Sequence, residues 1–338
     1  MLNQTLLNQS VLLGELPGWL QSINDLPPRS LMELLPVWLQ PVWIAFAGAA
    51  VVLLIMALKY QVLKLVLPKV AAILLITAKE AMAQPLFYVS LALGAFLILM
   101  VFPFLPYNTF GEDIKMLKDS GLTVIMLLSI LMALWTASVS IADEIEGRTA
   151  LTLLSKPVAR WQFIIGKFLG ILAPVALMFV VLGTLFLGTV SYKVSYDARE
   201  NSQSPPTAEQ CLEEMAIIVP GIFLAFLEAI VLTSISVAIS TRLPMLPNLV
   251  ICWSIYVLGH LVPLLVQSSV GEFEIVRFVG QFIATILPVL EHFNMQAAVA
   301  TGRAVPLEIV AWATLYCFLY SSFAILGALF LFEDRDLA

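Results

Sequence analysis

Residues 143–167 read DEIEGRTALTLLSKPVARWQFIIGK and form a charged island between two long apolar runs. Upstream, residues 122–142 carry no charge, and downstream, residues 161–190 carry only Lys167. An uncharged stretch of about twenty residues can cross a bilayer as an α-helix. The island is therefore predicted to be a short loop between two membrane spans.

The order of charges in the island is typical of helix ends. Its acidic residues precede its basic ones, so a short helix there would carry negative charge at its positive dipole end. Glu144 and Arg148 have the i,i+4 spacing of a helical ion pair. Ser155 followed by Pro157 indicates a new helix start, with serine as N-cap and proline in the first turn. These features favour a docking segment, and the alternative is an ordinary cytoplasmic connection.

The composition indicates a membrane protein with several spans. Hydrophobic residues make up 61% of the 338 residues, charged residues make up 12%, and the mean hydropathy is +0.98. Soluble domains carry about 25% charged residues. We therefore expect an all-α integral membrane protein, a polytopic helical bundle in the lipid bilayer that does not bind nucleic acid. The net charge of −6 says little about partners, because the distribution of Lys and Arg among the loops matters more than the total.

The sequence contains no motif typical of catalysis or metal binding. Cys211, Cys252 and Cys317 have no close spacing, and neither His-Glu-x-x-His nor Gly-x-Ser-x-Gly occurs. The pair Gly166 and Lys167 lacks the earlier glycine of a Walker A loop. We therefore predict no catalytic residue, no metal site and no cofactor site, and the sequence contains no ATP-binding motif of the Walker A kind.

Seven apolar stretches are long enough to cross the bilayer. They are residues 42–58, 86–105, 122–142, 163–190, 216–240, 247–270 and 306–332. The first is an extra N-terminal transmembrane helix, and the other six belong to a core over residues 86–338. Residues 59–85 link the two. Residues 1–41, with prolines between leucine and tryptophan clusters, are expected to be extracytoplasmic or to lie along the outer membrane surface.

Basic residues predict the orientation. Ten of the seventeen Lys and Arg fall on the side of the charged island, in the shorter loops: Lys59, Lys64, Lys69, Lys79, Arg148, Lys156, Arg160, Lys167, Arg242 and Arg335. The positive-inside rule then places the island in the cytoplasm. With an odd number of spans, the C-terminus is cytoplasmic and the N-terminus is outside. No basic region precedes an early apolar core, so no cleaved signal peptide is expected, and the predicted location is the plasma or inner membrane.

The linker contains a second amphipathic candidate. Residues 69–84 have an apolar middle between Lys69 at one end and Lys79 and Gln84 at the other. This pattern predicts a cytoplasmic helix in the headgroup plane before the chain enters the membrane. The alternative is a short span, for which Lys69 and Lys79 lie too close together.

Three longer segments fall on the outer side. They are residues 107–121, 191–215 and 271–305. The second is polar and is expected to be a mobile loop. The third is apolar in patches over residues 278–290, which is compatible with a surface helix that packs on the rim.

Two ionisable residues fall at membrane depth. Glu228 lies in the stretch 216–240 and His260 in the stretch 247–270, each near the middle. Consecutive antiparallel helices would place them at similar depth as a hydrogen-bonded pair. Intramembrane carboxylates favour a role in a transport pathway, and the alternative is a protonated carboxyl that bonds a neighbouring helix for structural reasons.

A Gly-x-x-x-Gly spacing occurs at Gly166 and Gly170. Such spacing lets two helix backbones approach closely. It permits, without requiring, a close helix contact at the start of the stretch 163–190.

The charged island resembles the cytoplasmic coupling segment of the ABC-2 permease family. The matching residues are Glu144, Glu146, Gly147, Thr149, Leu153, Leu154, Ser155, Pro157, Arg160, Gly166 and Lys167. The final residues 330–337 resemble the family's Arg-Asp-Leu ending, and residues 77–87 resemble the lead-in to its first core helix. The resemblance covers roughly residues 68–338. Gln84 stands where the family usually has a basic residue, and two acids at 333 and 334 dilute the usually basic terminus.

The resemblance implies an ABC-2 (type V) exporter-like fold, a six-helix core plus one additional N-terminal transmembrane helix. It further implies the permease subunit of an ABC exporter, driven by a separate nucleotide-binding subunit and paired with a second permease chain, identical or different. The coupling segment 143–160 would press into the ATPase, with the segment 271–305 as a re-entrant cap. The implied coupling residues are Glu144, Glu146, Gly147, Thr149, Ser155, Pro157, Arg160 and Lys167, with Glu144, Glu146 and Arg160 as the main contacts. The substrate is not indicated.

Two alternatives belong to other functional classes. A proton-coupled secondary transporter would use Glu228 and His260 as a relay and need no ATPase, but it would leave the charged island without a role. A membrane scaffold or maturation factor would not transport at all, and a transport assay with a defined substrate would separate it from a permease.

Overall fold

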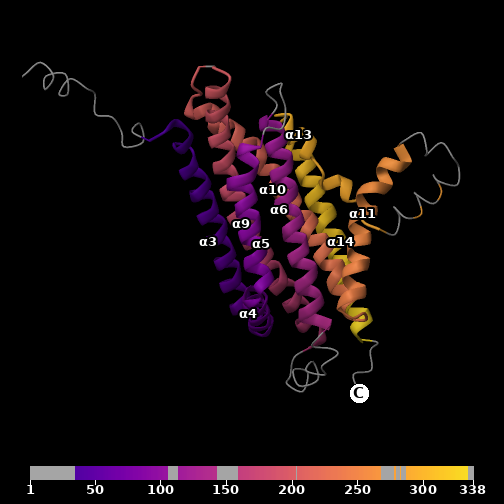
Figure 1. Ribbon diagram of the computed structural model, residues 1–338. Helices are drawn as coiled ribbons and strands as arrows, with labels where there is room; N and C mark the ends of the chain where they lie inside the picture. Colours follow the sequence, from indigo (N-terminus) through magenta and orange to yellow (C-terminus); the bar gives the residue numbers. More distant parts are fainter. Residues whose placement is uncertain are drawn as a thin grey trace, which may run out of the picture.

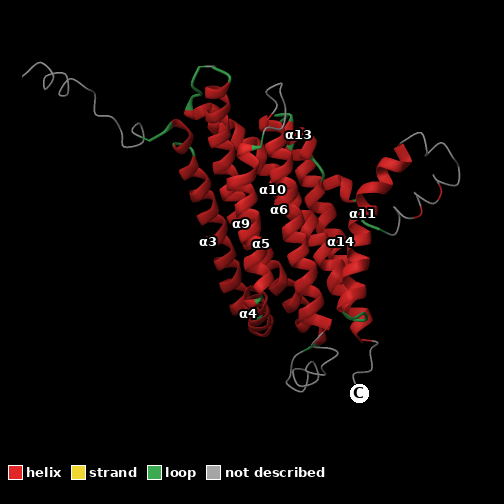
Figure 2. Ribbon diagram, in the orientation of Figure 1, coloured by secondary structure: helices red, strands yellow, loops and turns green. Residues whose placement is uncertain are grey.

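The chain forms a bundle of long helices (Figure 1). The computed structural model describes residues 35–105, 113–142, 159–202, 204–267, 278, 282 and 287–333. Within these ranges the chain is helical and contains no strand (Figure 2). The predicted all-α polytopic architecture is confirmed.

The described part of the chain contains the following elements, in chain order. They are η2 Val37–Leu39, α3 Val42–Val66, α4 Pro68–Ala83, α5 Pro85–Phe96 with η3 Leu97–Val101 and η4 Phe102–Phe104, α6 Asp113–Ala137 with η5 Ser138–Ala142, α9 Arg160–Glu200, α10 Ala208–Ser240, α11 Met245–Gln267, η7 Leu290–Phe293, α13 Gln296–Ala300 and α14 Leu307–Glu333. Among the described helices, six are long and apolar enough to cross a membrane, counting η2 with α3, η3 and η4 with α5, and η5 with α6. The shorter apolar stretch Met245–Leu261 lies in α11.

Several helices extend beyond the predicted spans. α9 has 41 residues, about 60 Å at a rise of 1.5 Å per residue, which is about twice the hydrocarbon core. The prediction of a polar loop over residues 191–215 is therefore wrong, because α9 runs to Glu200 and α10 begins at Ala208. Similarly, α6 begins at Asp113, inside the predicted segment 107–121. Hydropathy ends a span at the first charges, whereas a helix continues for as long as its backbone and neighbours allow.

The linker after α3 is also helical. α3 continues to Val66, past the predicted end at residue 58, and only Leu67 separates it from α4. α4 covers nearly the residues 69–84 predicted for the interfacial helix, and Figure 1 shows it lying across one end of the bundle. We call this the α4 end and the opposite one the α13 end. α14 finishes at the α4 end, where η5 also stops and α9 starts (Figure 1).

α4 rests on α9 through two glycines. A Cβ on Gly166 would lie 2.8 Å from the Ile73 Cβ, and one on Gly170 would lie 2.6 Å from the Thr77 Cβ. On Gly170 it would also lie 2.9 Å from the backbone oxygen of Leu74. The close approach that the Gly-x-x-x-Gly spacing permits is thus used to bind α4 to the bundle.

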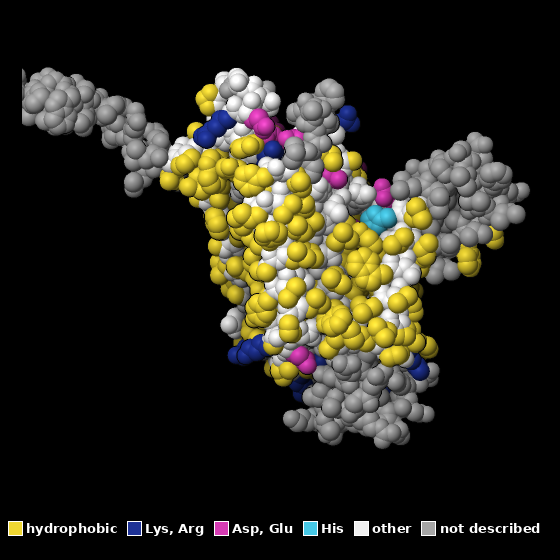
Figure 3. Space-filling model, viewed as in Figure 1, with side chains coloured by type: hydrophobic (Ala, Val, Ile, Leu, Met, Phe, Trp, Pro, Cys, Tyr) yellow, Lys and Arg dark blue, Asp and Glu magenta, His cyan; other side chains and the backbone are white. Residues whose placement is uncertain are grey.

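The core lies among α6, α9 and α10, whose facing side chains are fully buried; examples are Ile130, Leu182 and Leu232. Outward-facing residues are apolar over the middle of the molecule, and charges gather at both ends (Figure 3). In lipid the tails are as apolar as the core, so close packing and polar contacts, rather than exclusion of water, hold such helices together.

Ion pairs join the helices at the α13 end. Lys193 on α9 is 2% exposed, with its Nζ 2.9 Å from Asp197 Oδ1 and 3.5 Å from Asp113 Oδ2 on α6. Lys118 on α6 likewise pairs with Glu214 on α10. The paired carboxylates offset the desolvation of each lysine, and removal of one partner leaves the other charges uncompensated.

Substitution of Lys193 by methionine should therefore destabilise the protein by about 3 kcal/mol, since it leaves Asp113 and Asp197 facing each other without the cation. Thermal unfolding of the detergent-solubilised protein measures the effect. Arg199→Met on the same helix is the matched control, because Arg199 is exposed. Equal melting temperatures for the two variants would contradict a structural role for the buried lysine.

Candidate functional site

The predicted coupling segment falls largely outside the described residues. Glu144, Glu146, Gly147, Thr149, Ser155 and Pro157 all lie there, and their role stays a prediction. Arg160 and Lys167, near the start of α9, are placed by the structure. The described chain leaves η5 and re-enters α9 at the α4 end, so the segment between them is attached at that end (Figure 1).

Arg160 ties the start of α9 to the end of α14. Its Nη1 donates a hydrogen bond to the Phe332 backbone oxygen at 3.2 Å, and the guanidinium lies 5.9 Å from the Phe332 ring centroid. A cation is favourable there because the last carbonyls of a helix lack intrahelical partners. Arg160 therefore braces the α4 end, and a contact with a separate ATPase would have to share this side chain.

Lys167 lies inside the bundle. It is 2% exposed, and its Nζ donates to Ser140 Oγ in η5 at 2.9 Å and lies 3.9 Å from Glu80 Oε2 on α4. The Phe163 ring centroid is 5.8 Å away. A side chain this deeply buried does not present its charge to another polypeptide. Lys167 links α9 to η5 and α4, and its predicted role in coupling stays a prediction.

Asn248 forms a second polar junction at the α4 end. Its Nδ2 lies 2.7 Å from Ser138 Oγ in η5, 2.9 Å from Ser236 Oγ and 2.7 Å from Ser240 Oγ, both in α10. A primary amide has two hydrogens, so two of these three acceptors are served at a time. The Cys252 thiol donates to the Asn248 side-chain oxygen. This junction was not predicted, although an asparagine in an apolar stretch, eight and twelve residues after two serines, is a signal in the sequence that could have indicated it.

Both junctions involve η5, which is a π-helix. Single π-helical turns inside α-helices recur at functional sites. η5 directly precedes the predicted coupling segment, so it connects that segment to α9 through Lys167 and to α10 and α11 through Asn248.

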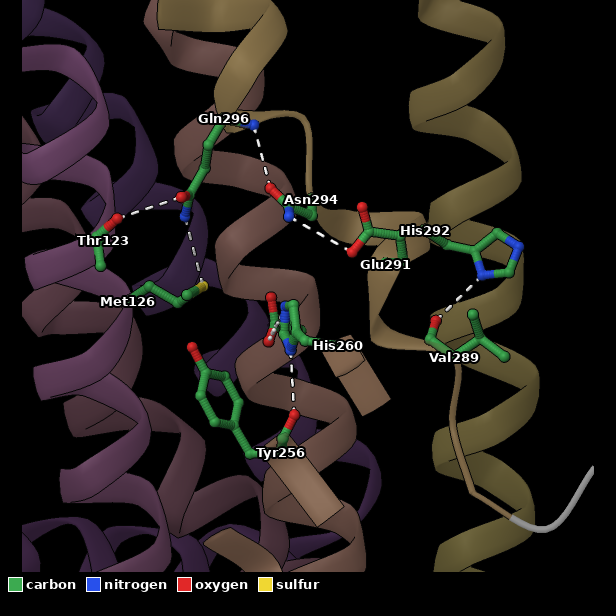
Figure 4. A network of polar contacts seen from close by, with 10 residues as sticks. Thr123, Met126, Tyr256, His260, Val289, Glu291, His292, Asn294 and Gln296 are labelled. Atoms are coloured by element: carbon green, nitrogen blue, oxygen red, sulfur yellow. Dashed lines mark hydrogen bonds and ion pairs between the residues drawn. The ribbon is translucent and has the colours of Figure 1, made fainter. Parts of the chain in front are cut away.

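Glu228 and His260 meet as predicted from their depths in consecutive helices. Glu228 on α10 is 1% exposed, and its Oε1 lies 3.5 Å from His260 Nε2 on α11. His260 keeps 22% of its side chain exposed. Its Nδ1 lies 3.1 Å from the Tyr256 backbone oxygen (Figure 4). Whether the pair serves transport stays a prediction.

The pair lines a cavity of about 120 Å³. The walls come from α6, α10, α11 and the segment that carries η7 and α13; they include Thr123, Met126, Glu228, Tyr256, His260 and Gln296. The Thr123 hydroxyl donates to Gln296 Oε1 at 3.2 Å, and Gln296 Nε2 approaches Met126 Sδ (Figure 4). The sequence analysis missed the contribution of residues 287–296, because it treated 271–305 as one outer segment.

The described part of that outer segment packs into the bundle. Leu290 and Phe293 of η7 are buried, and the Tyr316 hydroxyl of α14 accepts a hydrogen bond from Val289 N at 3.0 Å. Asn294 bridges η7 to α13 by contacts to Glu291 and to the Gln296 backbone N–H (Figure 4). Residues 287–305 thus cover the cavity toward the α13 end, where the sequence predicts a re-entrant cap. Most of the rest of the predicted cap lies outside the described residues.

The described residues contain no cluster of three or more His, Cys, Asp or Glu that could hold a metal ion.

A family model described as ABC-2 family transporter protein matches residues 51–332. The match begins inside α3 and ends one residue before the end of α14, so it spans both polar junctions and the cavity. No curated protein matches the chain.

Proposed function

Because the chain belongs to the ABC-2 transporter family of multi-pass membrane proteins, we propose that it is the permease subunit of an ATP-driven exporter whose ATPase is a separate polypeptide. The sequence supports the separation, since it contains no Walker A loop. A second permease chain, identical or different, would complete the transport pathway. The proton-coupled alternative leaves the charged island without a role, and a transport assay with a defined substrate separates the permease from a scaffold.

The observation that carries the proposal is the attachment of residues 143–160 at the α4 end. The segment has the residue pattern of a coupling segment, and it continues directly from η5. A push on this segment by an ATPase would move η5, whose Ser140 and Ser138 are bonded to Lys167 and Asn248. Since Asn248 serves two of three serine oxygens at a time, it can exchange partners between η5 and α10. The push would thereby reach α9, α10 and α11.

The α4 end is proposed to face the cytoplasm, with the C-terminus on that side. The described basic residues near this end include Lys59, Lys64, Lys69, Lys79 and Arg242, and the positive-inside rule places such residues in the cytoplasm. An ATPase must bind on that side because ATP is there.

A photo-crosslinking residue at position 149 tests this proposal in native membranes. Replacement of Thr149 should give a crosslink to a P-loop ATPase, identified by mass spectrometry. The same residue in place of Glu209, exposed at the start of α10 at the α13 end, is the control and should give none. An ATPase crosslink at 209 with none at 149 would overturn both the orientation and the coupling role.

A further inference from the structure

The cavity holds two hydrogen-bond acceptors that face each other. A backbone carbonyl only accepts, so the contact between His260 Nδ1 and the Tyr256 oxygen at 3.1 Å places the ring proton on Nδ1. In the neutral ring Nε2 is then a bare lone pair. It lies 3.5 Å from Glu228 Oε1, which is also an acceptor when ionised and for which the described residues supply no hydrogen-bond donor. With the ring neutral and the carboxylate ionised, no hydrogen lies between the two atoms, and this place is filled either by a proton on one of the pair or by an N–H group of a ligand.

Three of the other polar side chains that line the cavity are directed elsewhere, and the fourth, Tyr256, contributes its hydroxyl to the lining. The Thr123 hydroxyl contacts Gln296, the Gln296 amide nitrogen is directed to Met126, and the Asn294 amide nitrogen is directed to Glu291. None of the residues that line the cavity is Lys or Arg. The buried carboxylate of Glu228, with Glu291 beside the lining residue Asn294, makes the cavity suited to a positive group.

We infer that this cavity binds an ammonium group of the transported substrate, with Glu228 as counter-ion and His260 Nε2 as second acceptor. An ammonium carries several N–H donors, so one group can serve both atoms at once. The rings of Tyr256 and Phe293 line the same space and offer faces that attract a cation. The inference names the substrate class and rests on the proposed transport function.

The size of the cavity limits what enters it. About 120 Å³ accommodates on the order of four waters at their liquid volume of about 30 Å³ each, and a pocket for a whole drug-sized ligand measures about 300 Å³ or more. The cavity therefore takes a head group and leaves the remainder of the substrate outside. Because His260 is partly exposed, the head group can enter the cavity beside this side chain.

Nitrogen-15 NMR of the histidine-labelled protein in liposomes tests the inference. The chain has two histidines, so the spectrum contains two rings. Methylammonium, added at constant pH, should shift the His260 Nε2 resonance saturably and leave exposed His292 unchanged. Tetramethylammonium has the same charge and no N–H donor, and it should produce no shift. Two results would overturn the inference. One is a His260 resonance that responds to pH but not to methylammonium, and the other is an equal shift with methylammonium and tetramethylammonium.

A matched pair of variants checks the counter-ion. Glu228→Gln should weaken methylammonium binding roughly tenfold to hundredfold, the range for loss of a hydrogen bond to a charged group. Glu308→Gln, at an exposed glutamate at the start of α14, should bind as the wild type does. An unchanged His292 resonance reports that each variant is folded, and Glu228→Asp keeps the charge if glutamine disturbs the fold. Equal affinity in the folded Gln variant would contradict the site. Because the measurement needs neither ATPase nor transport, its failure is distinct from failure of the exporter proposal.

Discussion

Replacement of Gly170 by leucine is expected to detach α4 from the bundle. A Cβ at this position would lie 2.9 Å from the backbone oxygen of Leu74 and 2.6 Å from the Thr77 Cβ, and the rest of the leucine has no space. The flexible end of a side chain could move aside, but a helix backbone moves only if the whole helix does. Overpacking of this kind costs about 1–3 kcal/mol, and we expect the upper part of that range because the obstacle is backbone.

Two readouts report the loss of α4. The melting temperature of the solubilised protein should fall, and trypsin should cut sooner at Lys69 and Lys79, which α4 carries on its exposed side. Gly48→Leu is the control, because nothing lies within 4 Å of a Cβ there and α3 is mostly exposed. If both variants melt and digest alike, the glycine contact does not hold α4.

The loss of α4 would also weaken the α4 end internally. Glu80 on α4 is one of the groups near the buried Lys167 Nζ. Without α4 the lysine keeps its hydrogen bond to Ser140 but loses a compensating charge. The junction that connects η5 to α9 therefore depends on α4 as well as on its own members.

Hydropathy was sufficient to predict the helical class and the approximate spans. A run of about twenty uncharged residues is long enough to cross the bilayer, and a helix satisfies its backbone hydrogen bonds there. The pairing of Glu228 with His260 could be predicted as well, since consecutive antiparallel spans of similar length bring residues near their middles to similar depth. The helix predicted over residues 69–84 from the positions of Lys69, Lys79 and Gln84 is present as α4.

Helix ends and side-chain partners could not be predicted from the same information. α9 extends to Glu200 past Lys193, whose charge ends a hydropathy span but whose ion pair with Asp113 of α6 is favourable to a longer helix. The resemblance implies that Lys167 takes part in coupling, but no sequence pattern shows that this lysine is buried against Ser140. Gln296 lines the cavity and contacts Thr123 of α6, which is distant in the sequence. No local sequence pattern predicts this contact.

We propose that residues 143–160 bind an ATPase through their acidic residues. Glu144 and Glu146 are the predicted contacts, and reversal of both charges would place like charges against a complementary surface. Such juxtaposition costs several kcal/mol, and each 1.4 kcal/mol is a tenfold loss of affinity. The fold should survive, because the described contacts of η5 and α9 are made by other residues, among them Ser138, Ser140 and Lys167.

The most direct measurement is co-purification of the tagged chain after gentle detergent extraction. The wild type should bring down a P-loop ATPase at equal stoichiometry, and the double variant Glu144→Lys, Glu146→Lys should lose at least about tenfold of it. The matched variant Glu209→Lys, Glu213→Lys, at exposed glutamates near the α13 end, should retain it. Absence of any ATPase from the wild type, or full retention after reversal at 144 and 146, would contradict the account.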